Sequence, residues 1–194
     1  MARYRNSRVK IVRRLGVLPG FTSKKSNVKK LANFSFNRRL SQYGLHLQEK
    51  QKLRYNYGIT ESQLLKYVKK AKKLEGNTGE VLLKLLEMRL DNIIYRSGLA
   101  PTVSAARQLI SHGHVLVNKK RINIANYSCQ TLDKITIKCS LINDNFLQNS
   151  IPSYLSINNE SNEYIQIFIN DKINLKMLEL SINILLVLEY YSGR

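Results

Sequence analysis

The spacing of apolar residues predicts helices in the middle of the chain. Residues 46–56 suit a short helix that carries basic side chains among its leucines. The next helix has a clear start, because Thr60 and Gln63 fit a capping box while Ile59 and Leu64 fit a hydrophobic staple. That helix is expected to have Thr60 as its N-cap.

Two longer helices are predicted after it, followed by strands. Helical spacing of apolar residues continues over residues 77–98 and again over residues 101–113. Residues 115–117 and 121–124 suit a β-hairpin whose turn is residues 118–120. A left-handed conformation suits Asn118 in that turn but would cost Lys119 about 1 kcal/mol.

The remaining segments are less regular. Residues 135–137 and 165–169 are predicted to be strands, and residues 143–163, rich in Asn and Ser, to be a loop or insertion. Residues 1–45 show little helical periodicity, so an extended arm that folds on its partner is expected there. The pattern as a whole predicts an α+β fold.

The distribution of charge indicates a polyanionic partner. The 194-residue chain has a formal net charge of +19, and residues 1–75 alone carry 20 basic and three acidic side chains. Nucleic acid is the natural complement of such a field, and an anionic membrane surface is the second possibility. No apolar run approaches the ~18 residues that a membrane span needs, so no membrane partner is expected. The N-terminus also has no apolar stretch typical of a signal peptide.

The sequence offers little basis for catalysis or for metal binding. It has no Gly-rich phosphate loop, no nucleophile elbow and no carboxylate cluster, so no enzyme activity, catalytic residue or cofactor is expected. Two cysteines are too few for a four-Cys zinc site, and His112 and His114 lack a nearby third ligand. Metal binding is therefore not expected either.

Polar side chains gather where the helix over residues 101–113 leads into the hairpin. Several donors would meet on one edge of a small helix-plus-sheet module, and they suit the phosphates and 2′-hydroxyls of folded RNA. The alternative is a basic rim around a compact core with no ligand. The residues are Arg107, Gln108, Ser111, His112, His114, Asn118, Lys119, Lys120 and Arg121.

Several motifs resemble a known family. MRLDN (residues 88–92), ARQL (106–109) and HGHVLVN (112–118) resemble the small RNA-binding module named after small-subunit ribosomal protein four, which some RNA-modifying and tRNA-charging enzymes also contain. Other segments resemble the ribosomal protein family itself: MARYR (1–5), RRLG (13–16), LQEKQKLR (47–54), YGITE (57–61), GNTG (76–79) and EYYS (189–192).

The resemblance also suggests a branch of the family. LPGFT at residues 18–22, without the Cys cluster that many bacterial members carry there, resembles the plastid type. Three features depart from the family pattern: Lys119 replaces the usual turn Gly, Ala125 stands where Pro is common, and the loop around residues 143–163 looks shortened. The first departure leaves the turn type open.

The resemblance implies a domain organisation and a function. It implies a basic N-terminal arm (1–45), a helical rRNA-binding domain (46–87, completed by about 170–194) and an inserted RNA-binding module (88–169). It also implies a structural constituent of the small ribosomal subunit. Such a protein would be a primary binder of 16S rRNA that nucleates assembly of the body, lies near ribosomal proteins five and three where mRNA enters, and affects translational accuracy. It would not be a homo-oligomer.

Location and alternatives follow from the same resemblance. The plastid (chloroplast) stroma is expected, with the bacterial cytoplasm second. One alternative is an RNA-modifying or tRNA-charging enzyme carrying the same module, and another is a ribosome-associated quality-control or heat-stress RNA binder. An enzyme would need a catalytic Asp, nucleotide loop or metal set outside the module, and the sequence shows none.

Charge and resemblance together define the candidate RNA-binding residues. Those in the arm and the helical part are Arg3, Tyr4, Arg5, Arg8, Arg13, Arg14, Lys50, Lys52, Arg54, Tyr57, Lys69, Lys70 and Lys73. In the module, Arg89 joins the nine residues named above for the helix and hairpin.

Overall fold

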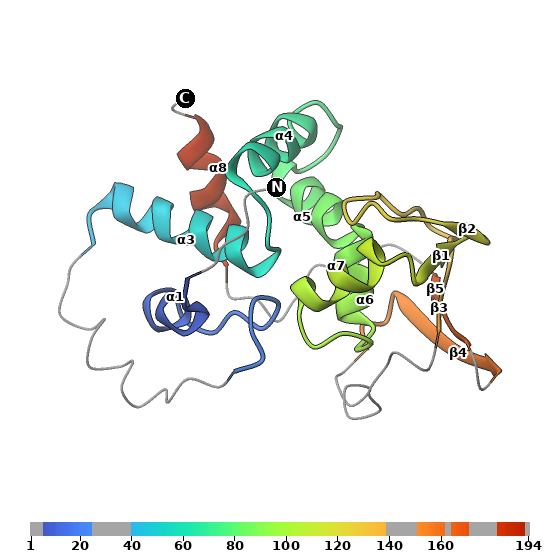
Figure 1. Cartoon of the computed structure of the whole chain (residues 1–194). Helices are drawn as coiled ribbons and strands as arrows, with labels where there is room; N and C mark the ends of the chain where they lie inside the picture. The colour runs from blue at the N-terminus through green and yellow to red at the C-terminus, as the bar shows by residue number, and fades with distance from the viewer. Residues whose placement is uncertain (1–5, 25–39, 139–150, 162–163, 171–181, 193–194) are drawn as a thin grey trace. The chain divides into compact units, whose positions relative to one another are not determined.

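The chain divides into a helical unit and a unit built around an antiparallel sheet (Figure 1). The helical unit comprises residues 1–82 and 179–194, and the sheet unit comprises residues 83–178. The α+β class predicted from the sequence is confirmed. The computed structural model describes residues 6–24, 40–138, 151–161, 164–170 and 182–192.

Within the described residues, the helical unit contains four complete helices and the beginning of a fifth. They are α1 (Arg8–Leu15), α3 (Gln42–Asn56), α4 (Glu61–Ala71), the first part of α5 (Thr78–Glu87) and α8 (Ile184–Ser192). The capping box of α4 is confirmed: the Thr60 hydroxyl accepts from the Gln63 amide, and the Gln63 side chain accepts from the Thr60 amide. None of the helices in the described ranges is long and apolar enough to cross a membrane.

Helix α1 corrects the prediction of an extended arm. Within residues 1–45, residues 8–15 are helical, and α3 already begins at Gln42. Val12 and Leu15 are buried in a small apolar cluster with Leu18 and Phe21. Leu18 and Phe21 lie beyond the end of the helix, so residues outside α1 complete the apolar cluster that stabilises it. Residues 1–5 and 25–39 lie outside the described residues.

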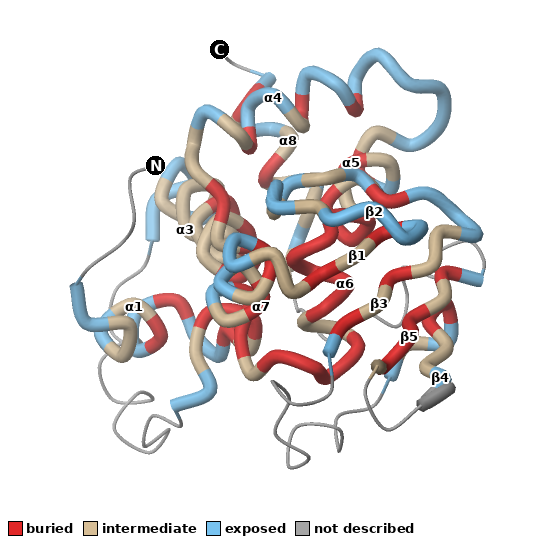
Figure 2. The backbone as a smooth tube through the Cα atoms, turned by 45° about the vertical axis from the view of Figure 1, so that its right-hand side comes forward, coloured by how far each residue is buried: buried red, intermediate tan, exposed pale blue. Residues whose placement is uncertain are grey.

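The sheet unit packs two helices against one face of a five-stranded sheet. The helices are α6 (Leu90–Arg96) and α7 (Val103–Ser111). The strands, all antiparallel, run in the order β2-β1-β3-β5-β4, with bounds Val115–Val117 (β1), Lys120–Arg121 (β2), Lys134–Lys138 (β3), Leu155–Ser161 (β4) and Tyr164–Ile169 (β5). Figure 2 shows buried residues along α6, β1, β3 and β5, whereas β2 is exposed. The core therefore lies between the helices and the sheet.

The single helix predicted over residues 77–98 is interrupted. α5 ends at Glu87 and α6 begins at Leu90, while Arg89 is extended (φ −76°, ψ 138°). The Met88 carbonyl accepts from the Cys129 amide at 2.9 Å, and the Leu90 amide donates to the Tyr127 carbonyl at 3.0 Å. Backbone pairing with a distant loop thus replaces helical hydrogen bonds at the break.

Two predictions about the strands also change. Residues 155–161, expected to be part of a loop, form β4, which pairs with β5 from Leu155 opposite Ile169 onward. The hairpin turn consists of Asn118 (φ 50°) and Lys119 (φ 66°) alone, so β2 begins at Lys120. A two-residue turn with both φ values positive is type I′, which suits the twist of a hairpin.

Candidate nucleic-acid interface

The end of α7 and the β1–β2 hairpin form one polar edge of the sheet unit. Thr102 caps the start of α7 by accepting from the Ala105 amide. The helix ends at His112, and Gly113 (φ 74°) turns the chain into β1. We call the resulting surface the hairpin edge; it consists of Gln108, Ser111, His112, His114, Asn118, Lys119, Lys120 and Arg121. The structure therefore brings together eight of the residues that the sequence singled out.

Contacts within the edge fix its cationic and aromatic groups. The His112 and His114 rings stack with centroids 6.0 Å apart and planes 26° apart. Arg121 Nη2 donates to the His112 carbonyl at 3.1 Å. A Cβ atom at Gly113 would overlap the Arg121 guanidinium, so only glycine lets this guanidinium lie against the backbone. Arg121 is thus held across the helix-to-strand turn.

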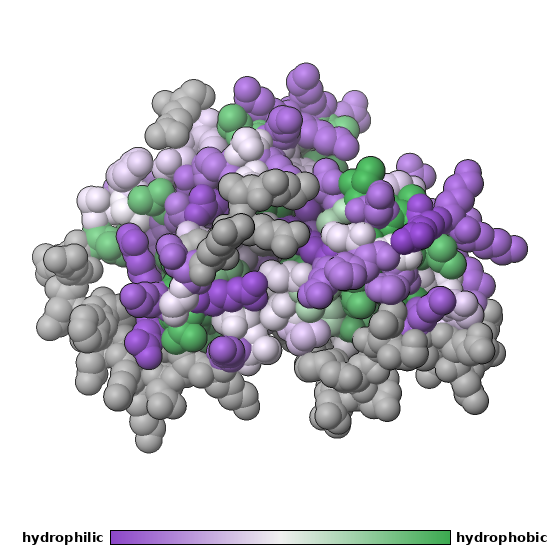
Figure 3. Space-filling view, in the orientation of Figure 1, coloured by the Kyte–Doolittle hydropathy of each residue, from purple (hydrophilic) through white to green (hydrophobic). Residues whose placement is uncertain are grey.

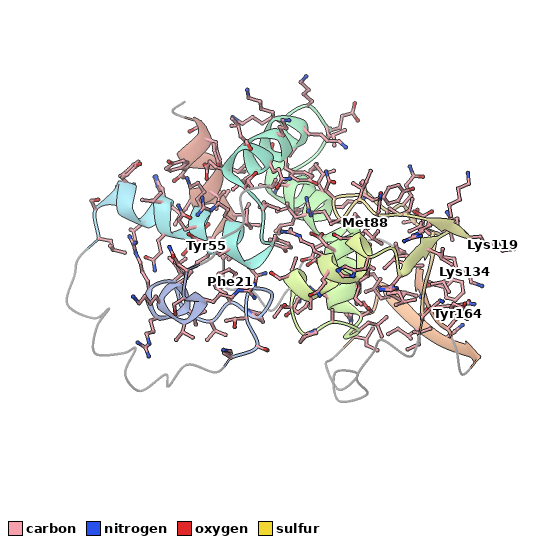
Figure 4. The ribbon with its side chains drawn as sticks, viewed as in Figure 1. Phe21, Tyr55, Met88, Lys119, Lys134 and Tyr164 are labelled. Carbon is pink, nitrogen blue, oxygen red and sulfur yellow. The ribbon has the colours of Figure 1, made fainter. Side chains whose placement is uncertain are left out.

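The hairpin tip is fixed by the Asn118 side chain. Its amide nitrogen donates to Asp133 Oδ1 at 2.7 Å, and its oxygen accepts from the Lys134 amide at 3.0 Å. Lys119 and Lys120 are exposed beside it, with Lys119 at the tip (Figure 4). Two cations are therefore presented on a turn that is itself tied to β3.

Arg107 lies between the edge and the core. Its Nε donates to Asp91 Oδ2 at 2.7 Å, and its side chain is 29% exposed. Asp91 is fully buried and also accepts two bonds from Arg89, at 3.0 and 2.9 Å. One carboxylate thus orients two guanidinium groups, which leaves the cluster with a net positive charge.

Candidates in the helical unit include an exposed set of lysines. Helix α4 buries Leu64, Val68 and Ala71. Its opposite side and the turn after it expose Lys66, Lys69, Lys70, Lys72 and Lys73. Hydrophilic side chains project from α4 in Figure 3, as they do from the hairpin of the sheet unit. Arg13 and Arg14 are exposed at the end of α1.

Three candidate residues lie in the interior and do not belong to an exposed surface. Lys50 is 4% exposed, with Nζ 2.9 Å from Glu61 Oε1 and 4.2 Å from the Tyr190 ring centroid. Tyr57 is 1% exposed, and Arg89, at 2%, is bound to Asp91. The expectation that these side chains contact RNA directly is therefore wrong.

Glu61 is the carboxylate that Lys50 neutralises. Burial alone would raise the Glu61 pKa, but hydrogen bonds from Tyr191 and Lys50, with the charges of Lys50 and Arg54, hold it below its ordinary value. Glu61 thus remains ionised, which keeps the buried Lys50 ammonium paired inside the helical unit.

The remaining candidates are partly engaged within the protein. Arg8 donates to the Phe21 carbonyl at 3.1 Å, and Lys52 pairs with Glu49 at 2.6 Å. Arg54 lies 3.9 Å from a Glu61 oxygen. The other three, Arg3, Tyr4 and Arg5, lie outside the described residues.

The chemistry of the hairpin edge is that of anion and hydroxyl binding. Among the described residues, no group of three or more His, Cys, Asp and Glu side chains could hold a metal ion. Cations at the edge suit phosphates, and the neutral Gln108, Ser111 and Asn118 suit sugar hydroxyls. A compact helix-plus-sheet unit with such a polar, basic edge is typical of the class of small RNA-binding modules.

Comparison with known proteins assigns the family. Residues 3–87 match the ribosomal protein S4/S9 N-terminal domain, and residues 88–135 match the S4 domain. The chain belongs to the ribosomal protein S4 family. It is 54% identical to small ribosomal subunit protein uS4c of Bigelowiella natans, with all of both chains covered. Proteins of the same name from Oltmannsiellopsis viridis and Chlorokybus atmophyticus are 50% and 47% identical, covering 99% of this chain and 100% and 98% of theirs.

The part that Asp91 plays was not predicted from the sequence. Asp91 stood out only as part of the MRLDN motif, and both Arg89 and Arg107 were expected to bind RNA. A signal was present, because an acidic residue next to Leu90 and Ile93 in an apolar stretch must be paired if it is buried. The pairing with Arg107, 16 residues away, could not be read from that signal.

Proposed function

We propose that this chain is a structural protein of the plastid small ribosomal subunit and that it binds the small-subunit rRNA. The observation that carries the proposal is full-length similarity, at about half of all positions, to proteins named as small ribosomal subunit protein uS4c. The basic surfaces of both units support it, because rRNA is a polyanion.

Binding would have an electrostatic part and a positioning part. Exposed lysines of α4 and arginines of α1 neutralise phosphates and release counterions. The hairpin edge adds groups with a fixed geometry, since Arg121 is held by His112 and the turn by Asn118. Fixed donors select a particular arrangement of phosphates and 2′-hydroxyls, so the edge orients the sheet unit on folded RNA.

The family resemblance supports finer proposals. The protein would bind 16S rRNA directly and early, nucleating assembly of the body. It would then lie near ribosomal proteins five and three where mRNA enters, and thereby affect translational accuracy. It would act as a single copy. Residues 141–194 carry three basic and six acidic side chains, which suits contact with basic proteins or solvent better than with RNA.

No observation favours an enzyme. The two matched family models together span residues 3–135, and both describe parts of ribosomal protein S4 or its RNA-binding module. The relatives are named as ribosomal proteins. An RNA-modifying or tRNA-charging enzyme would add a catalytic domain to the module, and here the rest of the matched region belongs to the ribosomal family.

Salt-dependent binding to rRNA tests the proposal. The full-length protein is titrated onto a 5′-domain junction fragment of plastid 16S rRNA at several salt concentrations. The affinity should fall steeply with salt, and Lys120→Ala should reduce the slope of log affinity against log salt by about 1. Lys84→Ala, which removes an equal charge from an exposed position on α5, is the matched control. Binding that is indifferent to salt, or failure to co-sediment with small subunits, would contradict the proposal.

A further inference from the structure

The two faces of the sheet differ in composition. Side chains alternate between faces along a strand, and α6 and α7 cover the face that carries Val115, Ile135 and Ile167. The register assigns the following residues to the other face, which we call the outer face: Leu116, Arg121, Lys134, Thr136, Lys138, Ser156, Asn158, Tyr164, Gln166 and Phe168. The hairpin edge shares only Arg121 with it.

Two aromatic rings on the outer face each lie opposite a lysine. Tyr164 pairs with Lys138 across β3 and β5, and Phe168 pairs with Lys134. Lys134 Nζ is 5.3 Å from the Phe168 ring centroid. Both rings are half-buried, and four residues along a strand separate them by about 13 Å. In Figure 4, Lys134 and Tyr164 lie on the side of the strands away from α6 and α7.

The charged residues of the outer face favour an anionic ligand. Three residues of this face, Lys134, Lys138 and Arg121, are basic. Gln166 lies between the two rings on β5, so the rings form no continuous apolar patch of the kind that binds another protein. Separated aromatic rings with adjacent cations are typical of surfaces that stack unpaired bases and hold their phosphates.

We propose that the outer face binds single-stranded RNA, with Tyr164 and Phe168 each stacking on one unpaired base and Lys138 and Lys134 contacting the adjoining phosphates. This inference rests on the proposed function in that the ligand is RNA, but it names a second surface and a different kind of RNA. A duplex keeps its bases stacked inside, so it cannot use the rings. Unpaired nucleotides can.

The test distinguishes binding to bases from binding to phosphates. The full-length protein is titrated with an oligouridylate of about 12 nucleotides, a length within the range of single-strand binding sites, and with an abasic chain of equal length and charge. Wild type should bind oligouridylate about 25-fold more tightly, at about 5-fold for each stacked base. Tyr164→Val with Phe168→Val should abolish that preference, and Tyr164→Phe should retain it.

Controls keep the result specific. The ring substitutions leave the charge unchanged, and valine suits a strand. Tyr43→Leu removes an exposed ring from α3 of the helical unit and should not alter the preference. If the double variant loses its folded circular dichroism spectrum, the two single variants, each expected to lose about 5-fold, provide the same test.

The outcomes distinguish this inference from the proposed function. Equal binding of both oligonucleotides by wild type, or a base preference that survives the valine substitutions, overturns the outer-face proposal. Either result leaves the proposed function standing if the junction rRNA is still bound. Failure to bind the junction rRNA contradicts the proposed function instead, while the base preference still decides the role of the outer face.

Discussion

Replacing Asp91 with Ala should destabilise the sheet unit far more than replacing Arg107 with Ala, although the two side chains share a hydrogen bond. Asp91 is fully buried and accepts from both Arg89 and Arg107. Its removal leaves the Arg89 guanidinium, only 2% exposed, without its carboxylate. Removal of Arg107 leaves Asp91 with both bonds from Arg89.

The structure sets the size of the difference. Removing one partner of a buried ion pair costs about 3–5 kcal/mol, because the other charge stays in the interior. Arg107 is 29% exposed and contributes one 2.7 Å bond to an acceptor that keeps other partners, so its loss should cost about 1–2 kcal/mol. The loss of stability in Asp91→Ala is therefore expected to exceed that in Arg107→Ala by about 1–4 kcal/mol.

Hydrogen exchange of backbone amides in β1 and β3, read by mass spectrometry, is the suitable assay. The chain contains no Trp to report on the sheet unit, and two units can open separately, which complicates a single global unfolding curve. The exchange free energy gives the local stability of the sheet. Equal losses for the two variants would refute the reasoning, since they would show that Arg89 does not depend on Asp91.

Three further outcomes are expected. Lys119→Gly should raise the exchange free energy of the β1 amides by about 1 kcal/mol, because φ is 66° at Lys119. Gly113→Ala should lower RNA affinity more than Gly76→Ala, because only at Gly113 would the new Cβ displace the Arg121 guanidinium from the His112 carbonyl. Burial, and to a smaller extent the nearby carboxylates of Asp133 and Asp91, raises the pKa of Cys129 from 9.0 to about 12. The folded state therefore keeps a proton that the unfolded chain releases, so stability should fall as pH rises from 9 to about 12, and alkylation of Cys129 should require unfolding. A Lys119→Gly variant no more stable than wild type, equal effects of the two glycine substitutions, or rapid alkylation of folded Cys129 would each contradict its premise.

Features set by neighbours in sequence were predicted well. The capping box of Thr60 and Gln63 involves four consecutive residues, and the structure contains it as expected. The polar cluster at the end of α7 and in the hairpin was predicted for the same reason, because a helix end, a glycine turn and a hairpin follow each other within about 20 residues. Local chemistry decides such features.

Features set by distant partners were not predictable. Apolar spacing continues through Met88, and the break there depends on pairing with residues 125–129. Lysine is a residue type that is usually exposed, and the burial of Lys50 depends on its contacts with Glu61 and Tyr190. β4 has a loop-like sequence rich in Asn and Ser and becomes a strand by pairing with β5. In each case tertiary contacts outweigh local preference.

At the break between α5 and α6, the beginning of the sheet unit is hydrogen-bonded to a later segment of the same unit. The Met88 carbonyl and the Leu90 amide are satisfied by Cys129 and Tyr127, and the Tyr154 hydroxyl donates to Glu87. Because these backbone groups have partners inside the sheet unit, α5 can end at Glu87 without leaving them buried and unpaired. Opening the break also requires residues 125–129 to detach, so the Leu90, Asp91 and Cys129 amides should exchange with solvent together.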